Sequence, residues 1–245
     1  MDNQISMGRA FEYRKARKMA RWANMAKTFT KIGREISLAV KEGGPDPDTN
    51  PRLRIAIQNA KTANMPKTNV ENAIQKAAGK DAESYDEVTY EGYAPHGIAV
   101  LVETATDNIN RTVANVRHVF NKYGGSLGTN GSVAYMFDRK GVFQIKAEGV
   151  DRDELELELI DHGLEEIKED EDGQLLLYCE FENFGTLQSA LEARNIETEE
   201  AKLDRIPTHE KSLSDEETEE VIKLLDIMEE DDDVMNVFHN MNMAE

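Results

Sequence analysis

Apolar residues in the first third of the chain recur at the three- and four-residue spacing of an amphipathic helix. Between residues 22 and 39 they are Trp22, Met25, Phe29, Ile32, Ile36 and Ala39. The Gly- and Pro-rich segment 43–48 ends this helix and predicts a linker. Asn50-Pro51 then predicts a second helix, with Asn50 as N-cap and proline in the first turn.

A third helix is predicted after the break at Met65-Pro66. Thr68-Asn69-Val70-Glu71 has the pattern of a capping box, and Gly79 follows the last apolar position. We therefore expect three helices packed on one small core within residues 1–80.

From residue 81 the pattern changes to short apolar segments separated by turn residues. It predicts strands at 88–93 and 98–104, then a helix capped by Asp107 or Asn108, and a further strand at 133–137. The helix should end at Gly124-Gly125.

Residues 139–205 predict a complete split βαββαβ pattern, which is ferredoxin-like. The expected strands lie near 142–146, 164–169, 174–181 and 196–203, and the helices near 151–162 and 183–193. An acidic helix at 215–230 and a strand at 234–239 remain, and they would complete the sheet begun in the middle of the chain.

The predicted fold class is α+β, with a three-helix N-terminal domain and two ferredoxin-like α/β domains, the third inserted into the second. The expected boundaries are 1–80 for the basic helical domain, 81–138 plus 206–245 for the middle domain, and 139–205 for the inserted domain.

Charge divides the chain more sharply than the net value of −19 suggests. Residues 1–80 contain 16 Lys and Arg against 7 Asp and Glu, a net charge of +9. The remainder contains 13 basic and 41 acidic residues, a net charge of −28. Polyanions would be attracted to the first region and repelled by the rest.

Basic residues are concentrated in the first helical stretch and continue into the second helix. Arg14, Arg17, Lys18 and Arg21 would share one helix face, where like charges repel unless an anion binds them. The alternative is a solvated surface face. We predict phosphate contacts without a base-reading code, made by Arg9, Arg14, Lys15, Arg17, Lys18, Arg21, Lys27, Lys31, Arg34, Arg52, Arg54, Lys61 and Lys67.

In one straight helix, the basic stripe would occupy the same sector as the apolar residues Met25, Ile32 and Ile36. One face cannot be both basic and core. We therefore predict a break near residues 21–24, or an arm that becomes ordered on binding.

Enzymatic chemistry has little support. Gly124 to Gly128 reads Gly-x-Ser-x-Gly, but a hydrolase elbow needs a strand before the serine and a helix after it, the reverse of the order predicted around Ser126. The same segment lacks the Gly-Lys-Ser/Thr of a P-loop. Five scattered histidines and the single Cys179 predict neither a metal site nor a disulfide. We expect no enzyme activity, no cofactor and no small-molecule substrate.

Two further features bear on function and location. Helix capping accounts for most of the polar run from Thr106 to Thr112, although an anion contact or a domain interface is an alternative. No apolar run reaches the roughly 20 residues of a membrane helix, and the first residues lack a secretory signal pattern. We expect a cytoplasmic protein, and the oligomeric state stays open.

Several motifs in order resemble the YebC/PmpR family over nearly the whole chain. They are Phe29 to Ile32 with Arg34 to Ile36, Gly44 to Pro47 with Asn50 to Arg54, Tyr90 to Tyr93, Thr106 to Asn108 with Asn110 to Val113, and Gly124-Gly125 to Phe137. The start departs from the family's common Gly-His-Ser-Lys-Trp-Ala, since this chain reads Gly8-Arg9-Ala10-Phe11 and has Trp22-Ala23 further on.

The resemblance implies three domains with a basic first domain, and a DNA-binding transcriptional regulator. Related proteins, including the mitochondrial translational activator of cytochrome oxidase, imply action on RNA or the ribosome instead. The leading hypothesis is a nucleic-acid-binding regulator. The alternatives are a translation factor that binds ribosomal RNA, a protein–protein adaptor using the acidic α/β surfaces, and a hydrolase using Ser126.

Overall fold

The computed structural model describes residues 25–79, 84–170 and 172–242. These residues form two compact units. The first unit contains the described residues up to Lys31, residues 84–137 and those from 207 onward, and the second contains residues 32–79 and 138–206.

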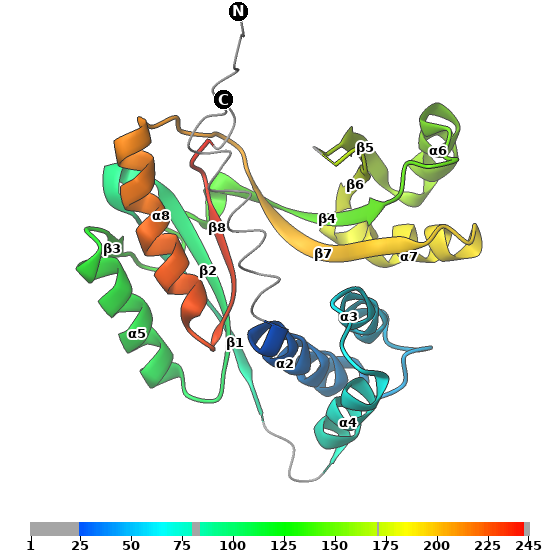
Figure 1. The fold of residues 1–245 in the computed structure, drawn as a ribbon, viewed down its shortest axis with the longest axis horizontal. Helices are drawn as coiled ribbons and strands as arrows, with labels where there is room; N and C mark the ends of the chain where they lie inside the picture. The colour runs from blue at the N-terminus through cyan, green and yellow to red at the C-terminus, as the bar shows by residue number, and fades with distance from the viewer. Residues whose placement is uncertain (1–24, 80–83, 171, 243–245) are drawn as a thin grey trace, which may run out of the picture. The chain divides into compact units, whose positions relative to one another are not determined.

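The first unit is built on a four-stranded antiparallel sheet with the order β3-β1-β2-β8 (Figure 1). β1 (Asp86–Tyr93) and β2 (Ala99–Thr106) form a hairpin through the turn at Pro95–Gly97. β3 is the short strand Ser126–Leu127, and β8 (Val234–His239) pairs with β2. The C-terminal strand therefore completes the sheet that the middle of the chain begins, as predicted.

Helices α5 (Ile109–Lys122) and α8 (Asp215–Glu230) cover one face of this sheet. The Asn108 side chain caps α5, and Ser214 with Glu217 forms a capping box at α8. Their apolar stripes meet strand residues in one core, which includes Val100, Val102, Val116, Phe120, Leu224, Leu225 and Met228.

The second unit contains a sheet with the order β5-β6-β4-β7. Its strands are β4 (Phe137–Ile145), β5 (Leu164–Glu169), β6 (Leu175–Glu180) and β7 (Thr198–Pro207). With helices α6 (Arg152–Leu159) and α7 (Phe184–Ala193), this is the strand order of a split βαββαβ fold. Phe143 stacks on Phe184 with ring centroids 4.5 Å apart, which joins β4 to α7 in the core.

Three helices complete the second unit. They are α2 (Met25–Gly43), whose residues from Ile32 onward belong here, α3 (Pro51–Thr62) and α4 (Lys67–Ala78). Ile36, Ala39, Leu53, Ala56 and Ala60 are buried between them. As predicted, the Asn50 side chain caps α3 by accepting a hydrogen bond from the Leu53 amide. The α+β class, the helical N-terminal part and the inserted βαββαβ sheet are thus confirmed.

Two local predictions are wrong. The predicted strand at 133–137 is a 3-10 turn at Ala134–Met136, and β4 begins only at Phe137. The predicted capping box at Thr68 is absent, because α4 already begins at Lys67 with Pro66 at the N-cap position. Proline fixes a backbone angle that suits the start of a helix, so Thr68 lies inside the first turn.

Candidate nucleic-acid interface

The predicted phosphate contacts divide into two groups. Arg9, Arg14, Lys15, Arg17, Lys18 and Arg21, together with the predicted break at 21–24, lie outside the described residues. The other seven residues lie on α2, α3 and α4. The structure therefore shows what surrounds the second half of the predicted set.

On α2, two lysines bind main-chain oxygens of the C-terminal segment within the first unit. Lys27 Nζ lies 3.3 Å from the carbonyl oxygen of Glu230, at the end of α8, and Lys31 Nζ lies 3.4 Å from that of Met235. An ammonium group at a helix C-terminus is favoured by the helix dipole. Arg34 is partly buried on the same helix.

Arg54 on α3 holds a loop in place. Its Nη1 donates hydrogen bonds to the carbonyl oxygens of Pro47 at 2.9 Å and Asp48 at 3.2 Å, and its Nε lies 3.5 Å from a carboxylate oxygen of Glu192. The guanidinium thus ties the linker before α3 to α7. This structural role was not predicted from the sequence.

The other three cations lie beside glutamates at the surface. Arg52 Nη1 is 2.8 Å from Glu42. Lys61 Nζ is 3.1 Å from Glu197, and Lys67 Nζ is 3.7 Å from Glu71. Exposed pairs of this kind contribute about 0–1 kcal/mol each and are screened by salt. A phosphate can therefore replace these carboxylates at little cost, whereas Arg54 would have to leave two carbonyl groups.

A seam of polar side chains joins α3 to the edge of the inserted sheet. β7 is an edge strand, and α3 covers the main-chain groups on the side of β7 that has no neighbouring strand. Asn59 donates to the carbonyl oxygen of Ala201 at 2.9 Å and accepts from the Ala201 amide at 3.3 Å, as a neighbouring strand would. Gln58 donates to Thr198 O at 2.5 Å, and Thr62 donates to Glu199 O. Ile55 adds an apolar contact to the inserted domain's core.

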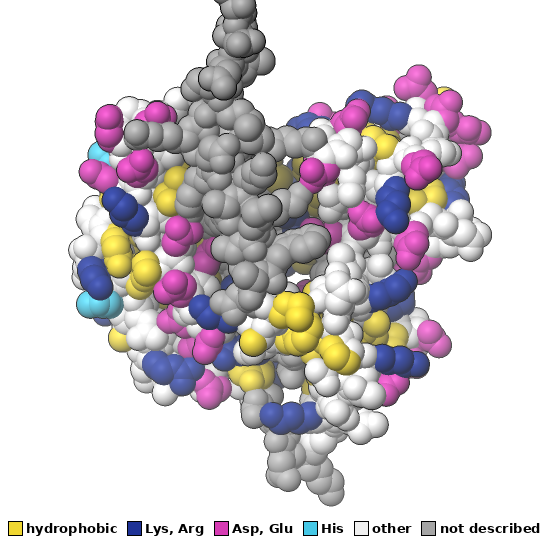
Figure 2. Space-filling model, in the orientation of Figure 1, with side chains coloured by type: hydrophobic (Ala, Val, Ile, Leu, Met, Phe, Trp, Pro, Cys, Tyr) yellow, Lys and Arg dark blue, Asp and Glu magenta, His cyan; other side chains and the backbone are white. Residues whose placement is uncertain are grey.

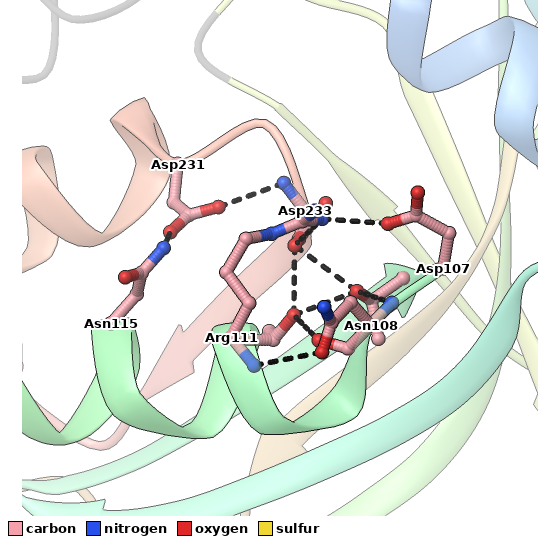
Figure 3. Close-up of polar contacts among 8 residues, drawn as sticks. Asp107, Asn108, Arg111, Asn115, Asp231 and Asp233 are labelled. Atoms are coloured by element: carbon pink, nitrogen blue, oxygen red, sulfur yellow. Dashed lines mark hydrogen bonds and ion pairs between the residues drawn. The ribbon is translucent and has the colours of Figure 1, made fainter.

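Several side chains of the polar segment Thr106–Thr112 bind the same buried carboxylate (Figure 3). Asp233, between α8 and β8, is 2% exposed. Its Oδ2 accepts hydrogen bonds from Thr112 Oγ1 at 2.7 Å, Thr106 Oγ1 at 3.1 Å and Arg111 Nη2 at 2.7 Å. Arg111 also binds Asp107 at 2.7 Å. The hydrogen bonds with Asp233 and then Asp107 raise the pKa of the Arg111 guanidinium above its usual value.

This cluster stabilises the fold, because its cation and hydroxyl groups bind the protein's own carboxylate and are not available to an external anion. It joins the start of α5 to the C-terminal segment, and a second contact, from Asn115 Nδ2 to Asp231 at 2.9 Å, lies beside it. Of the two predicted caps, Asp107 and Asn108, the structure shows Asn108, whose side chain accepts a 3.1 Å hydrogen bond from the Arg111 amide. No local sequence signal pointed to Asp233, which lies more than 120 residues further along the chain.

The glycine segment is also held by a buried acid. Glu91 on β1 is 3% exposed, and its carboxylate accepts hydrogen bonds from the amides of Gly131, Val133 and Ala134 at 2.6–2.7 Å. These amides are the type that binds phosphate in nucleotide loops, but here the protein's own carboxylate occupies them. Ser126 lies in β3, after a helix, so its surroundings differ from those of a nucleophile elbow.

Other chemical sites are not evident in the residues that the structure describes. No group of three or more metal-ligating side chains occurs among them. Cys179 is buried in β6, and burial raises the pKa of its thiol to about 12, which makes it a poor nucleophile near neutral pH. In the same residues, no helix has the length and apolar character of a membrane span.

Comparisons with known proteins also divide the chain into an N-terminal helical part and a larger remainder. Residues 9–80 match the family model described as the TACO1/YebC protein N-terminal domain, and residues 85–241 match that of the TACO1/YebC second and third domain. A "probable transcriptional regulatory protein" of Flavobacterium johnsoniae is 59% identical over 235 residues, covering 96% of this chain and 99% of the relative. One from Porphyromonas gingivalis is 57% identical over 240 residues, covering 98% and 99%.

A solved structure is similar as well. The crystal structure of a conserved hypothetical protein from Aquifex aeolicus aligns with a TM-score of 0.79 and 43% sequence identity. The alignment covers 90% of this chain and 91% of the other.

Proposed function

Because the chain belongs to the TACO1/YebC family, we propose that it is a nucleic-acid-binding regulatory protein whose basic N-terminal region contacts phosphates. Charge separation carries the proposal. Residues 1–80 have a net charge of +9, and the rest of the chain has −28. A polyanion would bind the first region and avoid most of the remainder.

The surroundings of the described cations are compatible with replacement of their carboxylate partners by phosphate groups. Lys61 and Lys67 form exposed, weak ion pairs with glutamates, and the partly exposed Arg52 forms one with Glu42. Phosphate binding would release counterions from the nucleic acid, a gain that such pairs do not offer. Arg54 and the lysines bound to main-chain oxygens would instead position the basic region.

We assign duplex DNA as the leading target, because similar proteins are named probable transcriptional regulatory proteins. RNA within the ribosome presents the same phosphate chemistry and is the alternative. The proposal includes no catalytic step. The buried Cys179 thiol and the reversed setting of Ser126 support a protein that acts by binding.

The test is salt-dependent binding of the full chain to a DNA duplex and to purified ribosomes. The variant R14Q/R17Q/K18Q/R21Q removes four charges from the N-terminal region. K146Q/K168Q/K202Q/K223Q removes four from the acidic remainder and is the matched control. If each of the four substituted residues contacts a phosphate, the log–log salt slope on the DNA duplex falls by about 3.6 in the first variant. Equal slopes for the first variant and the wild type on both targets would overturn the proposal.

The same measurements separate the two targets. A transcriptional role predicts that the affinity for DNA exceeds that for ribosomes at physiological salt. Crosslinking in cells followed by sequencing of the bound nucleic acid provides the independent measurement. Recovery of mainly ribosomal RNA would favour the translational alternative and overturn the assignment to DNA.

A further inference from the structure

The longest stretch without an acidic residue lies in the acidic part of the chain. Residues 108–137 contain no Asp or Glu over 30 positions, although 48 of the 245 residues are acidic. Their charged residues are Arg111, Arg117 and Lys122, all on α5. The predicted division of charge at residue 80 does not include this segment, which is cationic although the region around it is strongly acidic.

The three cations of α5 have different surroundings. Arg111 binds Asp107 and the buried Asp233. Arg117 and Lys122 are both exposed, and among the described residues no carboxylate lies within ion-pair distance of either. Lys122 Nζ lies 5.4 Å from the centre of the neighbouring Tyr123 ring. Arg117 and Lys122 therefore present unneutralised charge to solvent.

The solvent-facing side of α5 consists mainly of hydrogen-bond donors. Asn110, His118 and Asn121 are exposed together with Arg117 and Lys122, while Val116 and Phe120 point into the core. In Figure 2, dark blue and cyan side chains lie over α5 at the left of the view, with some yellow hydrophobic side chains between them. A lysine in the last turn stabilises a helix through the dipole, but an arginine in the middle of α5 gains nothing comparable.

We infer that the exposed side of α5 is a second nucleic-acid contact, in which Arg117 and Lys122 bind backbone phosphates and the neighbouring amides and imidazole add hydrogen bonds. The inference rests on the proposed function and extends it to a part of the chain assigned there to repulsion. An acidic protein partner is less suited to this surface, because protein interfaces usually have an apolar centre. Phosphate contacts need only cations and polar donors.

The experiment compares three full-length proteins on the same DNA duplex and on an RNA duplex of the same sequence. R117Q/K122Q removes the two α5 charges, and glutamine has nearly the same helix propensity as either residue. K146Q/K168Q is the matched control, since it makes the same change in net charge at lysines that already lie 3.3 Å and 3.0 Å from Glu199 and Glu166. Circular dichroism and the urea midpoint verify that all three are folded equally.

We expect the salt slope of R117Q/K122Q on the DNA duplex to fall by about 1.8, the value for two lost phosphate contacts, with the largest loss of affinity at low salt. The slope of the control should equal that of the wild type. A wild-type slope in R117Q/K122Q, with binding otherwise intact, would overturn the α5 contact and leave the proposed function standing. If the wild type binds neither duplex at low salt, both the proposed function and this inference are wrong. Equal slope losses in the control would also overturn the inference, because net charge alone would then explain the effect.

Discussion

Helices α3 and α5 look alike in sequence but not in the fold. Each contains three Lys or Arg residues and no acidic residue. In α3, Arg52, Arg54 and Lys61 all lie beside glutamates, and Arg54 also binds two carbonyl groups. In α5, only Arg111 is paired, and Arg117 and Lys122 face solvent without a carboxylate partner in the described structure.

The net charge of a region therefore does not show which of its cations are free of carboxylate partners. α3 belongs to the basic region, yet its docking against β7 brings Glu192 and Glu197 to its cations. α5 belongs to the acidic region, yet residues 108–137 supply no carboxylate of their own.

The largest effect should come from Asp233→Asn. The change removes the buried carboxylate that binds Arg111, the paired cation of α5. The asparagine amide that replaces it is an uncharged and therefore weaker partner for two threonine hydroxyls and the guanidinium. We expect the unfolding free energy to fall by about 2–4 kcal/mol in urea denaturation. Asp107→Asn, which alters the exposed partner of the same arginine, should cost less than about 1 kcal/mol. Equal losses in both would show that burial of Asp233 is irrelevant.

Asn59→Ala tests the hydrogen bonds that hold α3 against the edge of β7. The Ala201 amide and carbonyl lose their side-chain partner at the edge of β7, and we expect a loss of about 1–3 kcal/mol. Asn72→Ala on α4 changes the same residue type at an exposed position and should stay within about 0.5 kcal/mol. Urea denaturation followed by circular dichroism measures both. Identical midpoints would mean that α3 does not depend on the β7 edge.

Glu197→Gln would make α3 resemble α5 at one position. It removes the carboxylate beside Lys61 without changing the lysine, at a stability cost below about 1 kcal/mol. If Lys61 contacts phosphate, DNA should bind more tightly at low salt, and the salt slope should steepen by up to about 0.9. Lys61→Gln in the same background should cancel the gain. A gain that persists without Lys61 would point to general repulsion by Glu197.

The smallest effect concerns pH and the capping box of α8, the helix beside α5. The Ser214 amide hydrogen bond lowers the pKa of Glu217, and His96, 3.4 Å away, adds to the shift. A carboxyl whose pKa is lowered by folding stabilises the protein above its unfolded pKa of about 4.3, and the contribution is lost as pH falls through the folded pKa. Urea titrations of wild type and Glu217→Gln should therefore differ near neutral pH and converge in acid. A difference that stays constant with pH would exclude the ionised carboxylate as its source.

Most elements could be predicted because their signals are local. The helix at 215–230 and the strands at 164–169 and 234–239 were predicted with the bounds that the structure shows. Each has a regular apolar period bounded by turn or capping residues. Segment 133–137 forms a 3-10 turn instead of the predicted strand for the opposite reason, since the amides of Val133 and Ala134 bind the carboxylate of Glu91, which is more than 40 residues away in the chain. All thirteen proposed phosphate contacts stay predictions, and the six from Arg9 to Arg21 also lie outside the described residues.

Local patterns in the sequence were enough to predict most of the helices and strands, the insertion of one βαββαβ unit, and the division of charge between the first 80 residues and the rest. Hydrophobic period, capping and composition act over a few neighbouring residues, so they can be recognised along the chain. Which cations are neutralised depends on the three-dimensional packing, because the glutamates beside Arg54 and Lys61 and the buried Asp233 beside Arg111 are more than 100 residues away in the chain. Ion pairs form over a few ångströms in space, and sequence distance does not encode that proximity.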